Sequence, residues 1–201
     1  MFFCTPFFKK RINSYPRNPK KDTPHNKYYQ AYTAGYLMEE HTSKKQSVMI
    51  LIGSILLCNC AGLLGALATS TGQDSWYATL IKPSFNPPSW LFAPVWTLLY
   101  VLMGISLFLV IMEGKKGRNI RIPLILFAVQ LILNTLWSFA FFGLESPLYG
   151  LLVITPLWVF IFATIVTFYP IRKAAAWLLV PYIAWVSFAT ILNYALYSLN
   201  L

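Results

Sequence analysis

Five apolar runs separated by short polar segments constrain this chain more than any other feature of its sequence. Each run has roughly the 20 residues that a helix needs to cross about 30 Å of hydrocarbon. Prolines inside the runs, such as Pro94, Pro156 and Pro181, fit membrane helices, because neighbouring helices can satisfy the freed carbonyls. The sequence therefore predicts an all-α, polytopic membrane protein built as a bundle of five transmembrane helices. The runs are Val48–Thr69, Trp90–Met112, Ile122–Gly143, Leu148–Tyr169 and Ala174–Leu199.

The composition agrees with this fold class and places most of the charge outside the runs. Hydrophobic residues make up 57% of the chain and charged residues 11%, which is unlike a soluble domain. Residues 1–47 hold nine Lys or Arg against three acids, and so carry most of the net charge of +10. A basic segment beside a membrane is typical of topogenic or lipid-contacting tails and disfavours nucleic acid as a partner. We expect residues 1–47 to form a disordered basic tail and residues 48–201 to form the membrane domain.

Two further interpretations of the tail stay open. Residues 1–21 are basic and contain no acid, as in transit peptides, but their prolines disfavour the amphipathic helix of such peptides. Alternatively, Met38 is the true start, and MEEHTSKKQS is then a short tail before the first helix.

The charges between the runs alternate along the chain. The tail, the loop Glu113–Arg121 and the pair Arg172 and Lys173 are basic, whereas the segments around Asp74 and Glu145 are neutral or acidic. By the positive-inside rule, the basic segments lie in the cytoplasm and the N-terminus is cytoplasmic. We expect an integral, multi-pass protein of a bacterial cytoplasmic membrane.

Common catalytic and metal-binding patterns do not occur in the five runs. Both histidines lie in the tail, so we expect no metal site and no axial ligand for a haem iron. No charged residue lies in the middle of a run, which disfavours an ion or proton pathway. Cys58 and Cys60 point to different helix faces and are interpreted as packing residues.

Three runs place aromatic residues beside neutral amides on one helical face. An amide in a membrane must find a partner, so these faces point into the bundle. The residues either hold the helices together or form the walls of a pocket for a flat, apolar ligand. The three sets, at helical spacing, are Trp96, Tyr100 and Met103; Gln130, Asn134, Trp137 and Ser138; and Tyr182, Trp185, Ala189 and Asn193.

Two other features each have two interpretations. The prolines of the segment Gly72–Ser89 exclude a regular helix, so Trp76 and Tyr77 either fold over the bundle as a lid or anchor the chain at the membrane interface. Small residues also recur every fourth position in the first run, which suits close packing within one protomer or against a second one. These small residues are Ser54, Cys58, Gly62 and Ala66.

Three segments carry a resemblance that covers the chain except for its tail. They are WYATLIKPSFNPPSWLFAPVWTLLYVLMG (76–104), LNTLWSFAFFG (133–143) and WLLVPYIAWVSFATILNYALYSLN (177–200). In these motifs the chain resembles the TspO/MBR family of tryptophan-rich sensory proteins and translocator proteins, also called the peripheral benzodiazepine receptor family. The resemblance implies a five-helix bundle, often a homodimer, that binds porphyrins and other tetrapyrroles and, in animals, cholesterol and synthetic drugs.

The resemblance also implies a function and a set of ligand-binding residues. The function would be porphyrin binding without axial metal ligation, in a sensor, scavenger or transporter. Some bacterial members are reported to degrade protoporphyrin IX in light, and Trp96 and Trp185 match the tryptophans implicated, so both would then be catalytic. The implied ligand-binding residues are Tyr77 on a capping loop, Trp96 on the second helix, Asn134 and Trp137 on the third, and Trp185 and Ala189 on the fifth.

One departure concerns the alternative function of a sterol or lipid transporter. The cholesterol motif of animal members needs a basic residue shortly after a tyrosine near the C-terminus. Here Tyr194 and Tyr197 are followed by no Lys or Arg. The sterol alternative therefore lacks the support of that motif, which is itself a weak pattern.

Overall fold

The computed structural model describes the backbone of residues 24–201 and the side chains from residue 44 onward. Within this part of the chain every regular element is a helix, and no strand occurs. The elements are α2 (Pro24–Ala68), α3 (Trp76–Thr79), the 3-10 turn η1 (Ser89–Leu91), α4 (Phe92–Lys115), α5 (Arg121–Ser138), the π-helical turn η2 (Phe139–Gly143), α6 (Pro147–Phe168), α7 (Lys173–Leu178) and α8 (Val180–Leu199).

Five helical segments are long and apolar enough to cross a membrane. They agree with the five predicted runs to within a few residues at most ends, and confirm the all-α, five-helix prediction. The agreement follows because length and hydropathy are local properties of the sequence. The segments are Lys44–Ala68, Ser89–Lys115, Arg121–Gly143, Pro147–Phe168 and Lys173–Leu199.

The first helix begins much earlier than the apolar run that it contains. Helix α2 starts at Pro24, a residue that suits the first turn of a helix, and no further proline interrupts the chain before α2 ends. The helix therefore includes residues 24–47, for which we expected no regular structure. The rest of the predicted disordered tail, residues 1–23, lies outside the described residues. The chain divides into two compact units, residues 1–45 and residues 46–201, and the second unit holds the bundle.

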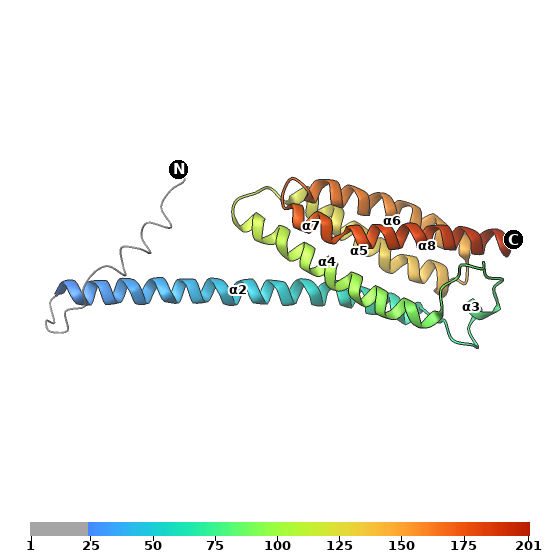
Figure 1. Cartoon of the computed structure of the whole chain (residues 1–201), viewed down its shortest axis with the longest axis horizontal. Helices are drawn as coiled ribbons and strands as arrows, with labels where there is room; N and C mark the ends of the chain where they lie inside the picture. The colour runs from blue at the N-terminus through green and yellow to red at the C-terminus, as the bar shows by residue number, and fades with distance from the viewer. Residues whose placement is uncertain (1–23) are drawn as a thin grey trace. The chain divides into compact units, whose positions relative to one another are not determined.

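Within the second unit each long helix packs against only a few of the others. Helix α5 packs on α6 and α6 packs on α8, while α4 packs on α7 and α8 (Figure 1). The fifth span bends between α7 and α8, where Pro181 lies in the first turn of α8 and cannot continue the preceding helix. The last part of α2 is joined to α5 by a hydrogen bond of 3.1 Å from the Thr135 hydroxyl to the Ala61 carbonyl.

The small residues of α2 serve packing inside the protomer. Ser54 and Cys58 are buried, and a side chain at Gly62 would collide with the ring of Tyr100. Ala66, the last of the four, is exposed, and so is Cys60. Of the two interpretations of this pattern, close packing within one chain is therefore the one that the structure supports for the first three positions.

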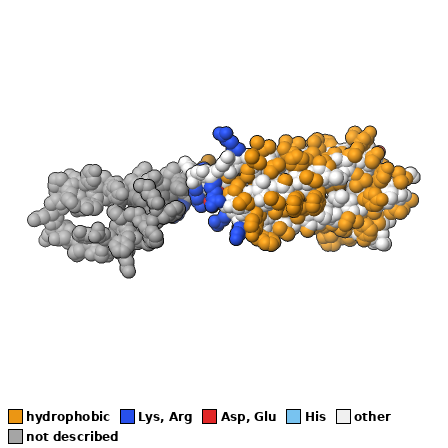
Figure 2. All heavy atoms as spheres, turned by 90° about the horizontal axis from the view of Figure 1, so that it is seen from above, with side chains coloured by type: hydrophobic (Ala, Val, Ile, Leu, Met, Phe, Trp, Pro, Cys, Tyr) orange, Lys and Arg blue, Asp and Glu red, His pale blue; other side chains and the backbone are white. Residues whose placement is uncertain are grey.

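The outer surface matches a membrane environment. Large apolar side chains such as Leu63, Ile122 and Phe162 are more than half exposed, and hydrophobic side chains cover the face seen in Figure 2. Lys and Arg gather at one end of this surface. The loops after α4 and after α6 contact each other: the Arg118 guanidinium donates a hydrogen bond of 2.9 Å to the Pro170 carbonyl.

Candidate functional site

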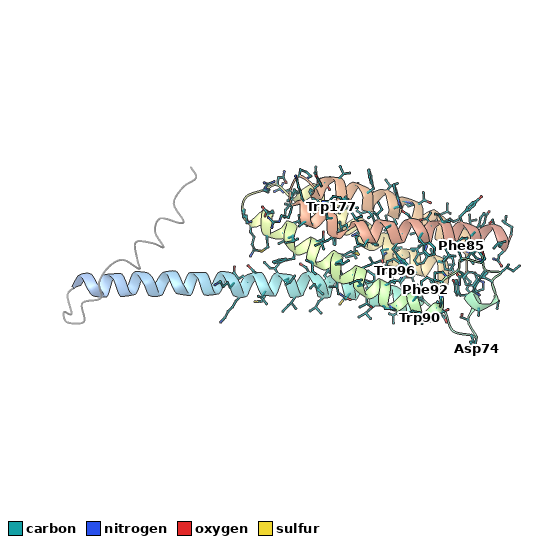
Figure 3. All side chains as sticks on the ribbon, in the orientation of Figure 1. Asp74, Phe85, Trp90, Phe92, Trp96 and Trp177 are labelled. Atoms are coloured by element: carbon teal, nitrogen blue, oxygen red, sulfur yellow. The ribbon has the colours of Figure 1, made fainter. Side chains whose placement is uncertain are left out.

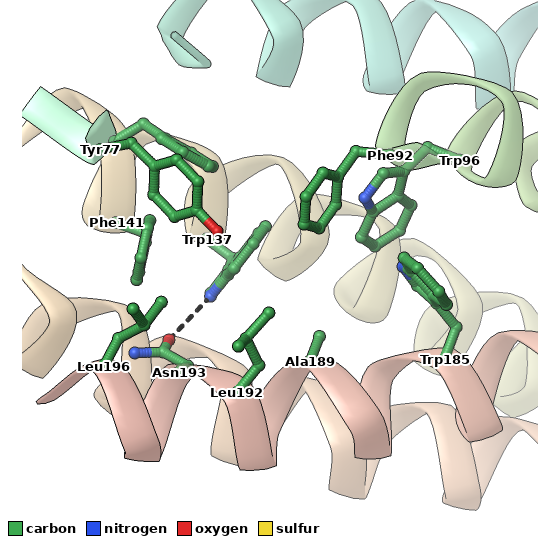
Figure 4. Close-up of a pocket in the computed structure, with 11 residues that line it drawn as sticks. Tyr77, Phe92, Trp96, Trp137, Phe141, Trp185, Ala189, Leu192, Asn193 and Leu196 are labelled. Carbon is green, nitrogen blue, oxygen red and sulfur yellow. Dashed lines mark hydrogen bonds between the residues drawn. The ribbon is translucent and has the colours of Figure 1, made fainter. Parts of the chain in front are cut away.

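An aromatic cavity lies at the other end of the bundle, beneath the connection between the first two spans. Its walls come from separate helices (Figure 4): Phe92 and Trp96 from α4, Trp137 from α5, and Trp185 from α8. Phe92 and Trp96 lie one turn apart on α4, and therefore on one face. The ring centroids of Trp96 and Trp137 are 6.4 Å apart, and those of Phe92 and Trp185 are 6.2 Å apart.

The π-helical turn η2 continues α5 and supplies the far wall of the cavity. It brings two consecutive side chains, Phe141 and Phe142, to the lining, with ring centroids 4.8 Å apart. Phe141 also stacks on Trp137, at 5.6 Å and an interplanar angle of 26°. Such single π turns often occur at functional sites.

The connection Gly72–Ser89 forms a lid over the cavity. Tyr77 of α3 is only 3% exposed, and its ring lies 5.7 Å from that of Phe142. Its hydroxyl donates a hydrogen bond of 2.7 Å to the Oδ1 atom of Asn86 within the same connection. Burial raises the pKa of the Tyr77 hydroxyl, which keeps it protonated as a donor. Of the two interpretations of this segment, the structure shows the lid.

The lid is fastened to the end of α8 by one side chain. The Ile81 N–H donates a hydrogen bond of 2.9 Å to Asn200 Oδ1, and Asn200 Nδ2 donates one of 3.0 Å to the Ile81 carbonyl. Asn200 is itself held by a bond of 2.8 Å from Nδ2 to the Leu196 carbonyl. The Asn200 side-chain amide therefore satisfies both the N–H and the carbonyl of Ile81, as the backbone of a neighbouring β-strand does.

A buried polar cluster lies next to the cavity, on the far side of Trp96. The Tyr100 hydroxyl donates to Asn134 Oδ1, and Asn134 Nδ2 donates a hydrogen bond of 3.0 Å to the Tyr182 hydroxyl. Trp96 stacks on Tyr100 with ring centroids 5.7 Å apart. The Asn134 amide is thus occupied by two tyrosines.

Polar groups on the cavity wall itself are few. Asn193 lines the cavity, where its Oδ1 accepts a hydrogen bond of 3.2 Å from Trp137 Nε1 and its Nδ2 donates one of 2.8 Å to the Pro147 carbonyl. The indole nitrogen of Trp185 is buried and has no hydrogen-bond partner among the described residues. An unpaired buried donor is costly, so this N–H is available to an acceptor that enters the cavity.

The cavity is small in this structure. Its volume is about 30 Å³, which is room for a water molecule or two. Pockets that hold drug-sized ligands measure about 300–1,000 Å³. A large ligand can therefore enter only if the lid or the aromatic walls move.

The model of the TspO/MBR family matches residues 54–198, which is most of the bundle. The chain belongs to the TspO/MBR family. It is 45% identical over 155 residues to the Tryptophan-rich protein TspO of Chlorobaculum tepidum, which covers 77% of this chain and 98% of that protein. It is 44% identical over 154 residues to the Tryptophan-rich protein TspO of Archaeoglobus fulgidus (77% and 99%), and 37% identical over 150 residues to the Translocator protein of Bos taurus (74% and 89%).

The structure of this TspO/MBR protein brings five of the six expected ligand-binding residues to one cavity. Those five are Tyr77, Trp96, Trp137, Trp185 and Ala189. Asn134 does not line it, because its amide is turned to Tyr100 and Tyr182 behind Trp96. Ligand binding by Asn134 stays a prediction.

Other residues of the TspO/MBR cavity were not among the six ligand-binding residues that the resemblance implied. Asn193 follows Trp185 and Ala189 on one face of α8, so its spacing was a signal, but spacing does not tell which amide reaches a cavity. The phenylalanines of η2 lacked any such signal, because a π turn cannot be recognised from apolar residues alone. The additional lining residues are Phe92, Phe141, Phe142, Leu192, Asn193 and Leu196.

We expect Asn200→Ala to loosen the lid of this TspO/MBR protein. The change removes two hydrogen bonds to Ile81, each contributing about 0.5–1.5 kcal/mol, so local opening should become about tenfold more frequent. Hydrogen–deuterium exchange of peptides from residues 72–88, followed by mass spectrometry, measures this opening. Asn119→Ala is the matched control, because Asn119 accepts a bond from the Arg121 N–H in a different loop. Equal exchange in both variants would contradict the role of Asn200.

A second expected result concerns Gln130, which lies one turn before Asn134 on α5. Gln130 is fully buried, and neither its Oε1 nor its Nε2 atom has a partner among the described residues. Since an unsatisfied buried polar group costs about 1–3 kcal/mol, Gln130→Met should raise the melting temperature of the detergent-solubilised protein. Asn134→Leu should lower it, because both tyrosine hydroxyls then lose a partner. A lower melting temperature for Gln130→Met would show that this side chain is satisfied in solution.

Proposed function

We propose that this protein binds a flat, conjugated ligand of the porphyrin class in the aromatic cavity, as a sensor, scavenger or transporter of tetrapyrroles. The observation that carries the proposal is the meeting of Trp96, Trp137 and Trp185, from three different helices, at one cavity. Large aromatic faces offer stacking and dispersion to a macrocycle without requiring charge. Membrane helices hold these faces at fixed positions, which lowers the entropy cost of binding.

The polar groups of the cavity suggest how such a ligand is oriented. The unpaired Trp185 N–H suits an acceptor atom on the ligand, such as a carboxylate or carbonyl oxygen. Because we propose stacking and hydrogen bonding rather than an iron–protein bond, metal-free protoporphyrin should bind at least as tightly as haem. Tighter binding of haem through an axial ligand would contradict this mode.

The proposal requires the lid to open, since a porphyrin ring cannot fit in a cavity of about 30 Å³. The hydrogen bonds of Tyr77 and of the pair Ile81 and Asn200 hold the lid in its present position. Ligand entry should therefore be slow compared with free diffusion, and binding should order or displace residues 72–88.

Tryptophan fluorescence of the detergent-solubilised protein, titrated with protoporphyrin IX in the dark, tests the proposal. Saturable quenching that persists when cholesterol is added supports a tetrapyrrole site, because the sterol then does not displace the porphyrin. Displacement of protoporphyrin IX by cholesterol at a similar concentration would favour the sterol or lipid transporter. Absence of saturable quenching would leave the tetrapyrrole proposal without support.

A second candidate function is light-dependent degradation of protoporphyrin IX. It is favoured by the position of both Trp96 and Trp185 on the cavity wall, where their indoles would lie next to an excited porphyrin. The chemistry would belong to the porphyrin, molecular oxygen and these indoles. Loss of porphyrin absorbance under illumination tests it. The double variant Trp96→Phe, Trp185→Phe should stop that loss while dark binding persists.

We also propose that the N-terminus is cytoplasmic, that the protein lies in a bacterial cytoplasmic membrane and that it forms homodimers. The basic loops after α4 and after α6 lie at the same end of the bundle, where Arg118 contacts Pro170. By the positive-inside rule, this end faces the cytoplasm, which supports the orientation. Alkaline phosphatase fused after Leu201 should then be active, because five spans place that end outside the cytoplasm. An inactive fusion that is still inserted would contradict the orientation.

A further inference from the structure

A basic cluster lies at the end of the bundle away from the aromatic cavity, and its position does not depend on the proposed function. We define this cluster as Glu113 at the end of α4, Lys116 and Arg118 in the following turn, and Arg172 before α7. Figure 3 shows the separation of the two ends, with Trp177 of α7 near one of them and Phe92 and Trp96 near the other. The cluster therefore lies at the opposite membrane boundary from the lid.

The backbone turns at both connections bring Arg118 and Arg172 close to the carboxylate of Glu113. Gly117 has a φ of +92°, the left-handed conformation that glycine adopts without strain, and it turns the chain back at the end of α4. The Arg118 N–H then donates a hydrogen bond of 3.3 Å to the Glu113 carbonyl. Arg172 approaches from the connection between α6 and α7.

The cluster has an excess of positive charge. The Glu113 carboxylate lies 2.9 Å from Lys116 Nζ, 3.8 Å from Arg118 Nε and 3.7 Å from Arg172 Nη1. One negative and three positive groups leave a net charge of +2. Lys115, Arg121 and Lys173 lie beside them in the chain, whereas the other acids of residues 44–201, Asp74 and Glu145, belong to different connections.

The arginines also keep unused hydrogen-bond donors. The two guanidinium distances to Glu113 exceed the length of a hydrogen bond. Arg118 donates to the Pro170 carbonyl, and no hydrogen bond of the Arg172 side chain is found within residues 44–201. Each guanidinium offers five N–H donors in a planar fork that suits phosphate oxygens. Their side chains are about half exposed, at 54% and 52%, so an anion from outside can reach them.

We propose that the basic cluster binds the headgroup of an anionic phospholipid, with its phosphate held by Arg118 and Arg172. The membrane-crossing part of α4 ends at Lys115, so the cluster lies at the depth of lipid phosphates. Exposed apolar side chains of the adjoining helices, Ile122 and Ile125 of α5 and Val166 of α6, offer surface to the acyl chains. A lipid with a net negative charge is preferred, because a zwitterionic headgroup does not compensate the excess of +2.

The test compares phosphatidylglycerol with phosphatidylcholine of the same acyl chains, bound to the full-length detergent-solubilised protein and counted by native mass spectrometry. The wild type should retain phosphatidylglycerol preferentially. Arg118→Gln with Arg172→Gln should weaken that binding by about tenfold or more, since a basic residue near an anionic lipid contributes on the order of fivefold. Arg121→Gln with Lys173→Gln removes the same charge outside the cluster and should change it by about twofold or less.

Glu113→Gln separates lipid binding from a merely structural ion pair. Without the competing carboxylate the cluster gains positive charge, so phosphatidylglycerol should bind more tightly, by about threefold or more. Weaker binding in Glu113→Gln, or an equal loss in the two double variants, would overturn the proposal in favour of general surface charge. Displacement of the lipid by millimolar sodium phosphate, but not by sodium chloride of equal ionic strength, would also overturn it, and would indicate a site for a soluble anion.

Discussion

Trp185→Ala should lower the affinity for protoporphyrin IX by about thirtyfold or more in a dark fluorescence titration. Trp185 contributes both a ring face in the aromatic cavity and a buried N–H without a partner. Truncation of a buried tryptophan anchor commonly costs about 2 kcal/mol or more of binding free energy. The loss should appear in the dissociation constant, since the amplitude of quenching falls whenever any tryptophan is removed.

Two further variants test whether the loss of affinity comes from the position of Trp185 in the cavity and from its N–H group. Trp177→Ala removes a tryptophan that is 64% exposed on α7, far from the cavity, and should leave the dissociation constant unchanged. Trp185→Phe keeps an aromatic face but removes the N–H, so its affinity should lie between those of the wild type and Trp185→Ala. Equal affinities for Trp185→Ala and Trp177→Ala would mean that the porphyrin binds elsewhere.

Gly104→Leu should destabilise the bundle by about 3 kcal/mol or more, because it forces a side chain between two helix backbones. A Cβ atom at Gly104 would lie 2.5 Å from the Cα atom of Ile55 in α2, and no rotamer change can move a backbone atom away. Close approach of membrane helices depends on such small residues. A fall of about 10 °C in melting temperature in detergent, or failure to obtain a monodisperse protein, is the expected result.

Gly53→Leu is the matched control for this prediction. It makes the same change on α2, and a Cβ atom at Gly53 meets no other atom within 4 Å. Because helix propensity favours leucine over glycine, Gly53→Leu should be neutral or stabilising. Similar melting temperatures for the two variants would show that α2 and α4 do not approach each other closely in solution.

The sequence predicted the architecture well because the relevant properties are local. A run such as Ile122–Gly143 is long and apolar enough to span a membrane whatever its neighbours are, and α5 with η2 indeed covers residues 121–143. The start of α2 was missed, since residues 24–47 are not apolar and carry no period that marks a helix. Pro24 permits a helix to begin there but does not require one.

The candidate site was only partly predictable. Helical spacing put Trp185 and Asn193 on one face of α8, and Asn134 and Trp137 on one face of α5. It could not tell that Asn134 is occupied by Tyr100 and Tyr182 while Asn193 reaches the cavity. Periodicity fixes the direction of a side chain around its own helix axis, but neighbouring side chains decide which partner it meets.

By itself, the sequence determined five membrane helices, the TspO/MBR motifs and the inward direction of Trp96, Trp137 and Trp185, because each depends on composition and spacing within one segment. The tertiary structure alone decided the fastening of Ile81 to Asn200, 119 positions later in the chain, and the joining of Arg118 to the connection after α6. It also decided how small the cavity is. These features depend on how far each helix is shifted and rotated against its neighbours, which is set by side-chain packing across the bundle and leaves no periodic signal in the sequence.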